Sequence, residues 1–369
     1  MPQNLKALTA LRFFAAMWVV IFDFWPALGR PMPAFIAKGY LGVELFFVLS
    51  GFILSHVYLG AVGERRFSYP GFLWARLARV YPVHLATLAL MGAMVGAAIL
   101  VGLPAGDKVL VWSSLPAQLT LTQAWGLAPL GGWNHPSWSI SAEWFAYLAF
   151  PGFAWLAWRL RARPRLAVGL AVLLVAALES AFARLAGFPL TQATIAWGAL
   201  RIVPCFSLGC AVFLLWASHP VRTSRTALVV CAMAMAAIVG AAQVAAPDWI
   251  SVALFGALLF GLASVSGAGS TFLTSPVWTY LGEISFSIYM VCIPWQLASG
   301  KLLDHLLAGG GPAPLWLWLM QVLGVVPLAI VIHHLVERPA RDTMRRHGVP
   351  FGLGRASPAP PFAPALGSR

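Results

Sequence analysis

The first apolar stretch of the chain, residues 5–28, contains two residues of opposite charge, Arg12 and Asp23. At about 100° per residue, a spacing of eleven residues brings both side chains to one face of a helix, roughly 16 Å apart along its axis. They are therefore too far apart to form an ion pair with each other. Because ionisable groups cost at least about 2.5–3.5 kcal/mol each in a hydrocarbon layer, they normally face a protein interior or a water-filled cavity, where they serve chemistry or transport.

A second set of charges, Arg76 and Arg79, lies three residues apart on one face of a helix that enters the third apolar stretch. This spacing suits two adjacent phosphates of a ligand, since a guanidinium can bind a phosphate through two parallel hydrogen bonds. The alternative is an ordinary positively charged flank on the cytoplasmic side. Arg12 lies about two turns into the first stretch, and its expected partner is a phosphate.

Two carboxylates, Glu44 and Glu143, begin the second and fourth apolar stretches on the side where Asp23 lies. Each is expected near the outer mouth of a cavity, where it pairs with a cation or binds an acceptor hydroxyl. The alternative is that each only marks a helix N-terminus, where a carboxylate offsets the helix dipole by about 0.3–1 kcal/mol.

Two further features are assigned to the packing of the helices. The small residues Ser50 and Gly51 lie among bulky ones and allow a close helix approach around the cavity. Arg201 lies within an apolar stretch, and Glu179 and Glu283 are its candidate carboxylate partners.

The elements that must position these groups are membrane-spanning helices. Of the 369 residues, 60% are apolar and only 9% are charged, which is typical of a polytopic membrane protein. We expect one all-α bundle of about ten transmembrane helices, because ten apolar runs approach the roughly 20 residues that cross a bilayer. These runs are 5–28, 40–62, 80–103, 137–158, 166–186, 197–217, 226–246, 249–267, 277–299 and 314–336.

The distribution of Lys and Arg predicts the orientation of this bundle. Most basic residues fall in the connections on one side, including 159–165, Arg222 and 338–346, which by the positive-inside rule places both termini in the cytoplasm. The basic residues on the other side are Arg30, Lys38, Lys108, Arg184 and Lys301. The net charge of +13 is therefore a topology signal, and no nucleic-acid partner is expected. The expected location is the plasma membrane, which in a bacterium is the inner membrane.

The chain is expected to form one membrane domain, residues 1–346, followed by a Pro- and Ala-rich cytoplasmic tail, 347–369, with the composition of a disordered segment.

The longest connection, 104–136, is expected on the outer side of the membrane. It carries three Trp residues, which are either headgroup anchors or a platform for sugar rings. The four cysteines lie within apolar runs and lack metal-ligand spacing, so no metal site is expected.

Six separated motifs, taken in order, resemble those of the membrane acyltransferase-3 family, whose members move acyl groups onto extracytoplasmic carbohydrates. The motifs are residues 8–25, 39–54, 76–82, 138–144, 280–295 and 336–341. Each is weak alone, but the ordered set is specific and covers most of the chain. The resemblance implies an O-acyltransferase that uses acyl-CoA, with acetyl-CoA as the first candidate, to modify a glycan, a glycolipid or an exported metabolite.

The chain departs from the family pattern at two positions. The family has a His eleven residues after the Arg of its first span, and here that position is Asp23. A second His, common in the ninth span, is replaced by Cys292. Both imidazoles are therefore missing from a reaction in which a hydroxyl must lose its proton as it attacks the thioester carbonyl.

Asp23 is the first candidate to replace the missing base, because burial makes a carboxylate more basic. It could equally orient a neighbouring group, and His135 is the nearest candidate imidazole. The apolar setting of Cys292 favours a packed core residue over a reactive nucleophile.

The resulting assignment gives three roles to nine residues. The predicted catalytic residues are Asp23, Glu143 and His135; the predicted acyl-CoA ligands are Arg12, Arg76 and Arg79; and the predicted acceptor-binding residues are Glu44, Trp138 and Ser139. The expected partners are membrane lipids, acyl-CoA and a carbohydrate or glycolipid acceptor. Two other functions stay open: a relative that has lost catalysis and serves as a membrane binding or scaffold protein, and a transporter for a polar lipid.

Overall fold

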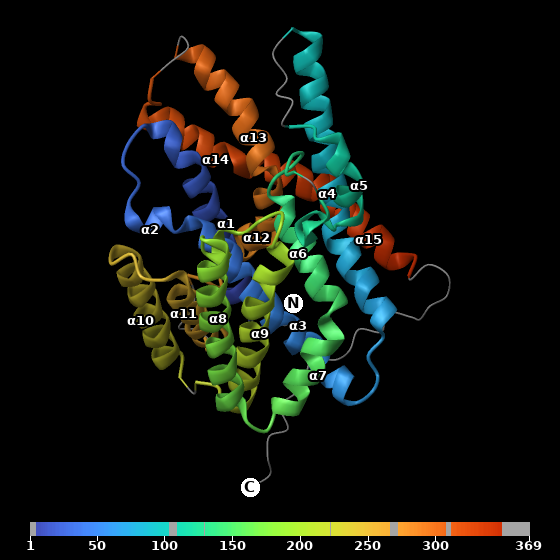
Figure 1. Cartoon of the computed structure of the whole chain (residues 1–369), viewed down its shortest axis with the longest axis vertical. Helices are drawn as coiled ribbons and strands as arrows, with labels where there is room; N and C mark the ends of the chain where they lie inside the picture. The colour runs from blue at the N-terminus through green and yellow to red at the C-terminus, as the bar shows by residue number, and fades with distance from the viewer. Residues whose placement is uncertain are drawn as a thin grey trace.

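The computed structural model describes residues 5–102, 109–128, 130–221, 223–265, 272–307 and 311–348, and every regular element within them is a helix (Figure 1). The predicted class, an all-α membrane bundle, is confirmed. The predicted tail, except for its first two residues, lies outside the described residues, as do Lys108 and Arg222. The α-helices are α1 (Lys6–Phe24), α2 (Ala34–Ala37), α3 (Gly42–Gly63), α4 (Tyr69–Leu100), α5 (Leu115–Thr120), α6 (Ser137–Leu148), α7 (Phe150–Leu160), α8 (Pro164–Ala186), α9 (Gly198–Ser218), α10 (Ser224–Gln243), α11 (Asp248–Ser264), α12 (Pro276–Glu283), α13 (Ser285–Leu306), α14 (Leu315–Ile332) and α15 (Arg338–Arg346).

Within the described residues, seven helical segments are long and apolar enough to cross a membrane, and α12 with α13 forms an eighth that is bent by 57°. Two predicted spans differ from this pattern. Helix α11 is apolar but has only 17 residues. The predicted span 137–158 is divided at Ala149 into α6 and α7, because Pro151 lacks the N–H of a continuous helix and its ring would clash with the preceding turn. The number of ten spans and their orientation stay predictions.

Helix α4 begins well before the apolar run that predicted it. The side chain of Ser68 accepts a hydrogen bond from the backbone N–H of Gly71, and Pro70 occupies the first turn, so the helix starts at Tyr69. Arg76 and Arg79 were expected on a flank that enters the span. They instead lie inside a continuous helix of 32 residues, which directs both side chains toward the interior of the bundle.

The core of the bundle depends on close contacts between helix backbones. Helices α3 and α9 cross at Gly51 and Gly209, where an added Cβ would overlap the carbonyl oxygens of Phe206 and Val48, respectively. The predicted close approach at the Ser50–Gly51 pair is therefore confirmed. Such contacts stabilise membrane helices because small residues allow van der Waals packing where no hydrophobic driving force exists between helices and lipid.

We expect Gly209→Ala to lower the free energy of unfolding by about 1–3 kcal/mol, the usual cost of forcing extra volume into a packed contact. Thermal unfolding of the purified protein in detergent measures this change. The matched control is Gly240→Ala in α10, because a Cβ there meets no atom within 4 Å. Equal melting temperatures for Gly209→Ala and wild type would contradict the role of this contact.

Candidate functional site

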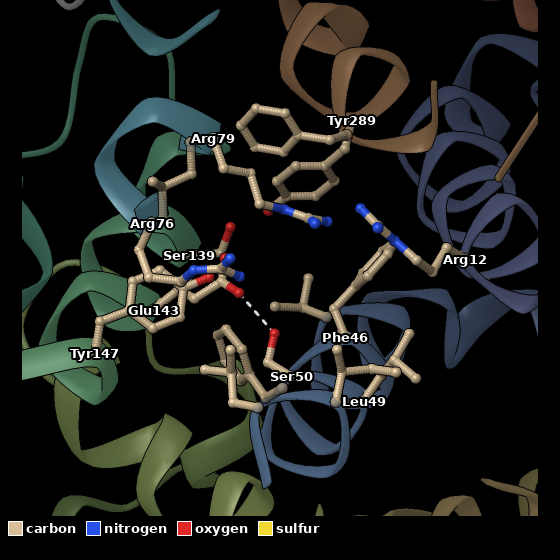
Figure 2. Close-up of a pocket in the computed structure, with 16 residues that line it drawn as sticks. Arg12, Phe46, Leu49, Ser50, Arg76, Arg79, Ser139, Glu143, Tyr147 and Tyr289 are labelled. Atoms are coloured by element: carbon tan, nitrogen blue, oxygen red, sulfur yellow. Dashed lines mark hydrogen bonds between the residues drawn. The ribbon is translucent and has the colours of Figure 1, made fainter. Parts of the chain in front are cut away.

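A cavity lined by α1, α3, α4, α6 and α13 brings together the three arginines that were predicted to bind acyl-CoA (Figure 2). Arg12 reaches it from α1, and Arg76 and Arg79 reach it from α4. We call it the arginine cavity; its other lining residues are Val43, Phe46, Phe47, Leu49, Ser50, Ile53, Leu54, Ser139, Ile140, Glu143, Tyr147, Phe286 and Tyr289. It encloses about 80 Å³. Pockets for drug-sized ligands enclose about 300–1,000 Å³, so the arginine cavity admits a small or thin group and excludes a whole nucleotide.

The three arginines carry positive charge that no close ion pair within the described residues compensates. Among the described residues, none of them forms an ion pair with a carboxylate within 4.0 Å. The Nε atom of Arg76 is buried and has no hydrogen-bond partner. The positive charges of Arg12 and Arg79 repel each other. A buried cation without a partner is costly, so this arrangement favours an anionic ligand.

One carboxylate, Glu143, lines the same cavity. Ser50 Oγ of α3 donates a hydrogen bond of 2.6 Å to Glu143 Oε1 of α6, which orients the carboxylate (Figure 2). Ser50 had been assigned to packing alone, and its contact with Glu143 was missed. The residues are 93 positions apart, so no periodicity in the sequence signals their contact.

A second carboxylate, Glu337, lies near the arginine cavity but is not among its lining residues. It accepts hydrogen bonds from Ser287 Oγ at 2.8 Å and from His333 Nδ1 at 2.9 Å. It also interacts electrostatically with Arg12 and Arg79. A π-helical turn, His333–Glu337, brings His333 and Glu337 together, and such turns are frequent at functional sites.

The two positions where the sequence resemblance implies histidines, Asp23 and Cys292, lie near each other. Asp23 is half-buried near the end of α1, and its backbone carbonyl accepts a hydrogen bond of 2.8 Å from Gln296 of α13. Cys292, fully buried one turn earlier on α13, lies within electrostatic reach of Asp23. Neither residue lines the arginine cavity, but Tyr289 does, and it also interacts with Asp23.

The remaining predicted residues near the start of α6 have different surroundings. His135 is exposed, and Trp138 is buried. Ser139 lines the arginine cavity, and its hydroxyl donates to the Pro136 carbonyl at 3.0 Å. Among the described residues, no group of three or more His, Cys, Asp or Glu side chains is arranged to hold a metal ion.

Comparison with known proteins agrees with this architecture. A family model described as an acyltransferase domain, acyltransferase 3, matches residues 5–334. The chain belongs to this acyltransferase family. It is 30% identical over 379 residues to the acyltransferase MdmB of Streptomyces mycarofaciens, a match that covers 93% of each protein. It is also 32% identical over 193 residues to protein 2 in the picA locus of Rhizobium radiobacter, which covers 48% of this chain and 97% of that protein. No solved structure gave a significant match.

The chain is therefore a multi-pass membrane acyltransferase that transfers groups other than amino-acyl groups. Its structure places five of the nine predicted site residues at the arginine cavity: Arg12, Arg76, Arg79, Ser139 and Glu143. The roles given to all nine stay predictions. The cavity could not have been assembled from the sequence alone, because its walls come from five helices.

Glu44 and Trp138 of this acyltransferase meet at a different arginine. Glu44 forms a buried ion pair with Arg201 of α9. The expected partners of Arg201, Glu179 and Glu283, were therefore wrong. The guanidinium carbon of Arg201 lies 4.4 Å from the ring centroid of Trp138, and Arg201 also donates to the Ala193 carbonyl at 2.7 Å. This buried arginine thus ties α3, α6 and α9 together.

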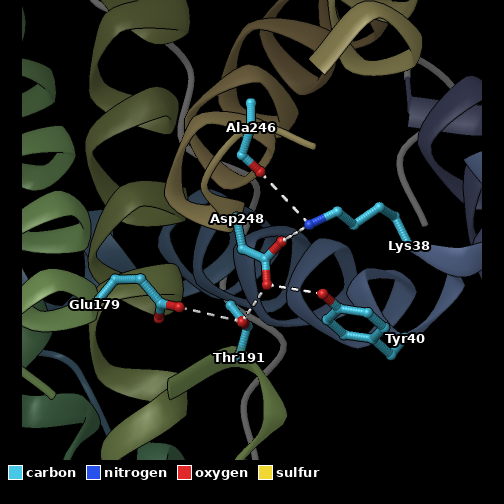
Figure 3. A network of polar contacts seen from close by, with 6 residues as sticks. All are labelled: Lys38, Tyr40, Glu179, Thr191, Ala246 and Asp248. Carbon is cyan, nitrogen blue, oxygen red and sulfur yellow. Dashed lines mark hydrogen bonds and ion pairs between the residues drawn. The ribbon is translucent and has the colours of Figure 1, made fainter. Parts of the chain in front are cut away.

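A polar network centred on Asp248 lies next to this ion pair (Figure 3). Asp248 accepts hydrogen bonds from Lys38 Nζ at 2.5 Å, from Tyr40 at 2.8 Å and from Thr191 at 2.5 Å. Thr191 also lies 3.2 Å from Glu179. The network joins the segment before α3, the connection between α8 and α9, and the first turn of α11, so it holds this end of the bundle together.

We expect Arg201→Met to lower the free energy of unfolding by about 3–5 kcal/mol, because it leaves the Glu44 carboxylate buried without its partner. The double variant Glu44→Gln/Arg201→Met should be less destabilised than the single variant, since the uncompensated charge is gone. Unfolding of both variants and of Glu44→Gln in detergent completes the cycle. Purely additive costs would show that the pair is not coupled.

Proposed function

We propose that this acyltransferase takes an acyl group, with acetyl as the first candidate, from cytoplasmic acyl-CoA. It transfers that group to a hydroxyl of an extracytoplasmic glycan, glycolipid or exported metabolite, across the plasma membrane, which in a bacterium is the inner membrane. The observation that carries the proposal is the arginine cavity, in which three arginines lie without a carboxylate ion pair among the described residues.

The chemistry of the cavity supports a phosphate-bearing donor. Guanidinium groups bind phosphates through charge-assisted, often bidentate hydrogen bonds, and the buried Nε of Arg76 is a donor that still lacks an acceptor. Because the cavity admits only a thin group, it suits the diphosphate or the pantetheine arm of acyl-CoA. The nucleotide end of the donor then lies outside the cavity, toward the cytoplasm.

The spacing along α1 supports the same donor. Arg12 and Asp23 lie on one face of this helix, roughly 16 Å apart along its axis. Acyl-CoA carries its phosphates and its thioester at opposite ends of an extended arm. A donor anchored by Arg12 can therefore present its thioester toward Asp23, on the side of the membrane where the acceptor is expected.

The reaction needs a base at that outer end. The acceptor hydroxyl attacks the thioester carbonyl and gives its proton to the base as the C–O bond forms. The tetrahedral intermediate then collapses, the C–S bond breaks, and CoA leaves as a thiolate that takes up a proton. We assign the base to Asp23, with Glu143 and His135 as the alternatives.

The residues predicted to bind the acceptor divide into two groups. Ser139 lines the cavity and carries a hydroxyl that can contact an acceptor. Glu44 and Trp138 both contact Arg201. We therefore propose Ser139 as the direct acceptor contact, and Glu44 and Trp138 as residues that hold its helix in place.

For the donor site, Arg76→Ala and Arg79→Ala should each weaken CoA binding by about tenfold or more. The physical reason is the loss of one charge-assisted contact, worth roughly 1.5–3 kcal/mol. Isothermal titration calorimetry with the purified protein in detergent measures the affinity. Arg163→Ala is the control, because Arg163 is an exposed arginine in the connection between α7 and α8. Unchanged affinity in both cavity variants would return these residues to the role of topology markers.

For the base, Asp23→Asn should lower the rate of acyl transfer by about 10²–10⁴, because the amide keeps the size of the side chain and loses its basicity. CoA affinity should stay unchanged, which separates loss of the base from loss of the fold. The rate is measured as CoA thiol release with an acceptor that supports turnover by the wild type. Full activity of Asp23→Asn would assign the base to Glu143 or His135 instead.

A further inference from the structure

Helix α15 extends the positive charge of the arginine cavity. It carries four arginines within nine residues, namely Arg338, Arg341, Arg345 and Arg346. The indole of Trp74 in α4 donates a hydrogen bond of 2.8 Å to the carbonyl of Met344, which fixes α15 against the inner part of α4 (Figure 1). The helix therefore has a defined place beside the cavity.

Two arginines of α15 adjoin those of the cavity. Arg341 and Arg345 are four residues apart and share one face of the helix. Arg345 interacts electrostatically with Arg76 and Arg79, as well as with Arg341. Arg341 also reaches Glu337, with 3.6 Å between Nη1 and Oε1. Arg345 and Arg341 thus extend the positive charge of the cavity arginines along α15, and we call these five arginines the track.

The charges of this track do not balance. Among the described residues, the three cavity arginines together with Arg341 and Arg345 outnumber the carboxylates near them, which are Glu143, Glu337 and Asp342 of α15 itself. Like charges at these separations repel each other and destabilise the charged forms. A ligand with several negative charges, distributed along the track, would remove this repulsion.

We propose that Arg341 and Arg345 bind the 3′-phosphate of CoA, an inference that rests on the proposed acyl-CoA donor. CoA carries two separate phosphate groups, the diphosphate next to the pantetheine arm and the 3′-phosphate on the ribose. The arginine cavity takes the first and is too small to enclose the nucleotide, so the second falls outside it. Arg345 interacts electrostatically with Arg76 and Arg79, and Arg341 lies one helical turn from Arg345 on the same face of α15.

A basic amphipathic helix can instead bind anionic lipid headgroups at the membrane surface. The geometry favours CoA, because the hydrogen bond of 2.8 Å between Trp74 and Met344 holds the residue next to Arg345 against the turn of α4 that carries Arg76. One ligand can therefore contact Arg345 and the cavity arginines at the same time. A lipid headgroup is the competing outcome of the test.

The test compares CoA with dephospho-CoA, which lacks only the 3′-phosphate, by calorimetry on the full chain in uncharged detergent. Wild type should prefer CoA by roughly fivefold or more, the effect of charge-assisted contacts that are partly open to solvent. Arg345→Ala should lose this preference and bind dephospho-CoA as the wild type does. Arg79→Ala should weaken the binding of both ligands. Arg346→Ala is the matched control, because it removes the same charge from the adjacent position, and it should keep the preference.

The failures of the two proposals are distinguishable. If the wild type binds neither ligand, the acyl-CoA donor itself is wrong, and the 3′-phosphate site falls with it. If the wild type binds both ligands equally, or Arg345→Ala keeps the preference for CoA, only the 3′-phosphate site is wrong and α15 serves the lipid surface. Because Arg341→Ala also removes the contact with Glu337, Arg345→Ala is the deciding variant.

Discussion

The cost of holding positive charge inside a membrane domain organises this protein. Arg201 meets that cost with a buried carboxylate, an aromatic ring and a backbone carbonyl, so its charge is used for structure. Arg12, Arg76 and Arg79 have no such ion pair among the described residues. The contrast between the two environments separates a structural arginine from those that line the arginine cavity, although Arg12 and Arg201 both lie in apolar stretches of sequence.

The structural arginine also supports the site. Its contacts join α3, α6 and α9, and the glycine contact between α3 and α9 brings their backbones together. Ser50 and Glu143 project into the cavity from two of these three helices and share a hydrogen bond. The position of the cavity carboxylate thus depends on packing that lies outside the cavity itself.

Asp23 and Cys292, the two positions where the resemblance implies histidines, lie within electrostatic reach of each other. Asp23 and Cys292 lie on different helices, but Asp23 acts electrostatically on Cys292 and on Tyr289, which lines the cavity. A change in the charge of Asp23 therefore changes the electrostatic potential at Cys292 and at Tyr289.

The sequence by itself determined the helical membrane class, the family, and every relation within one helix, such as the shared face of Arg12 and Asp23. These follow from apolar run length and from a fixed rotation per residue. It did not determine the break at Ala149 or the early start of α4, since caps and prolines there override hydropathy. Only the tertiary structure decided that Arg201 pairs with Glu44, 157 residues away, and that five helices close one cavity around three arginines. Contacts between helices depend on how small residues let the backbones approach, and no local periodicity records which helices become neighbours.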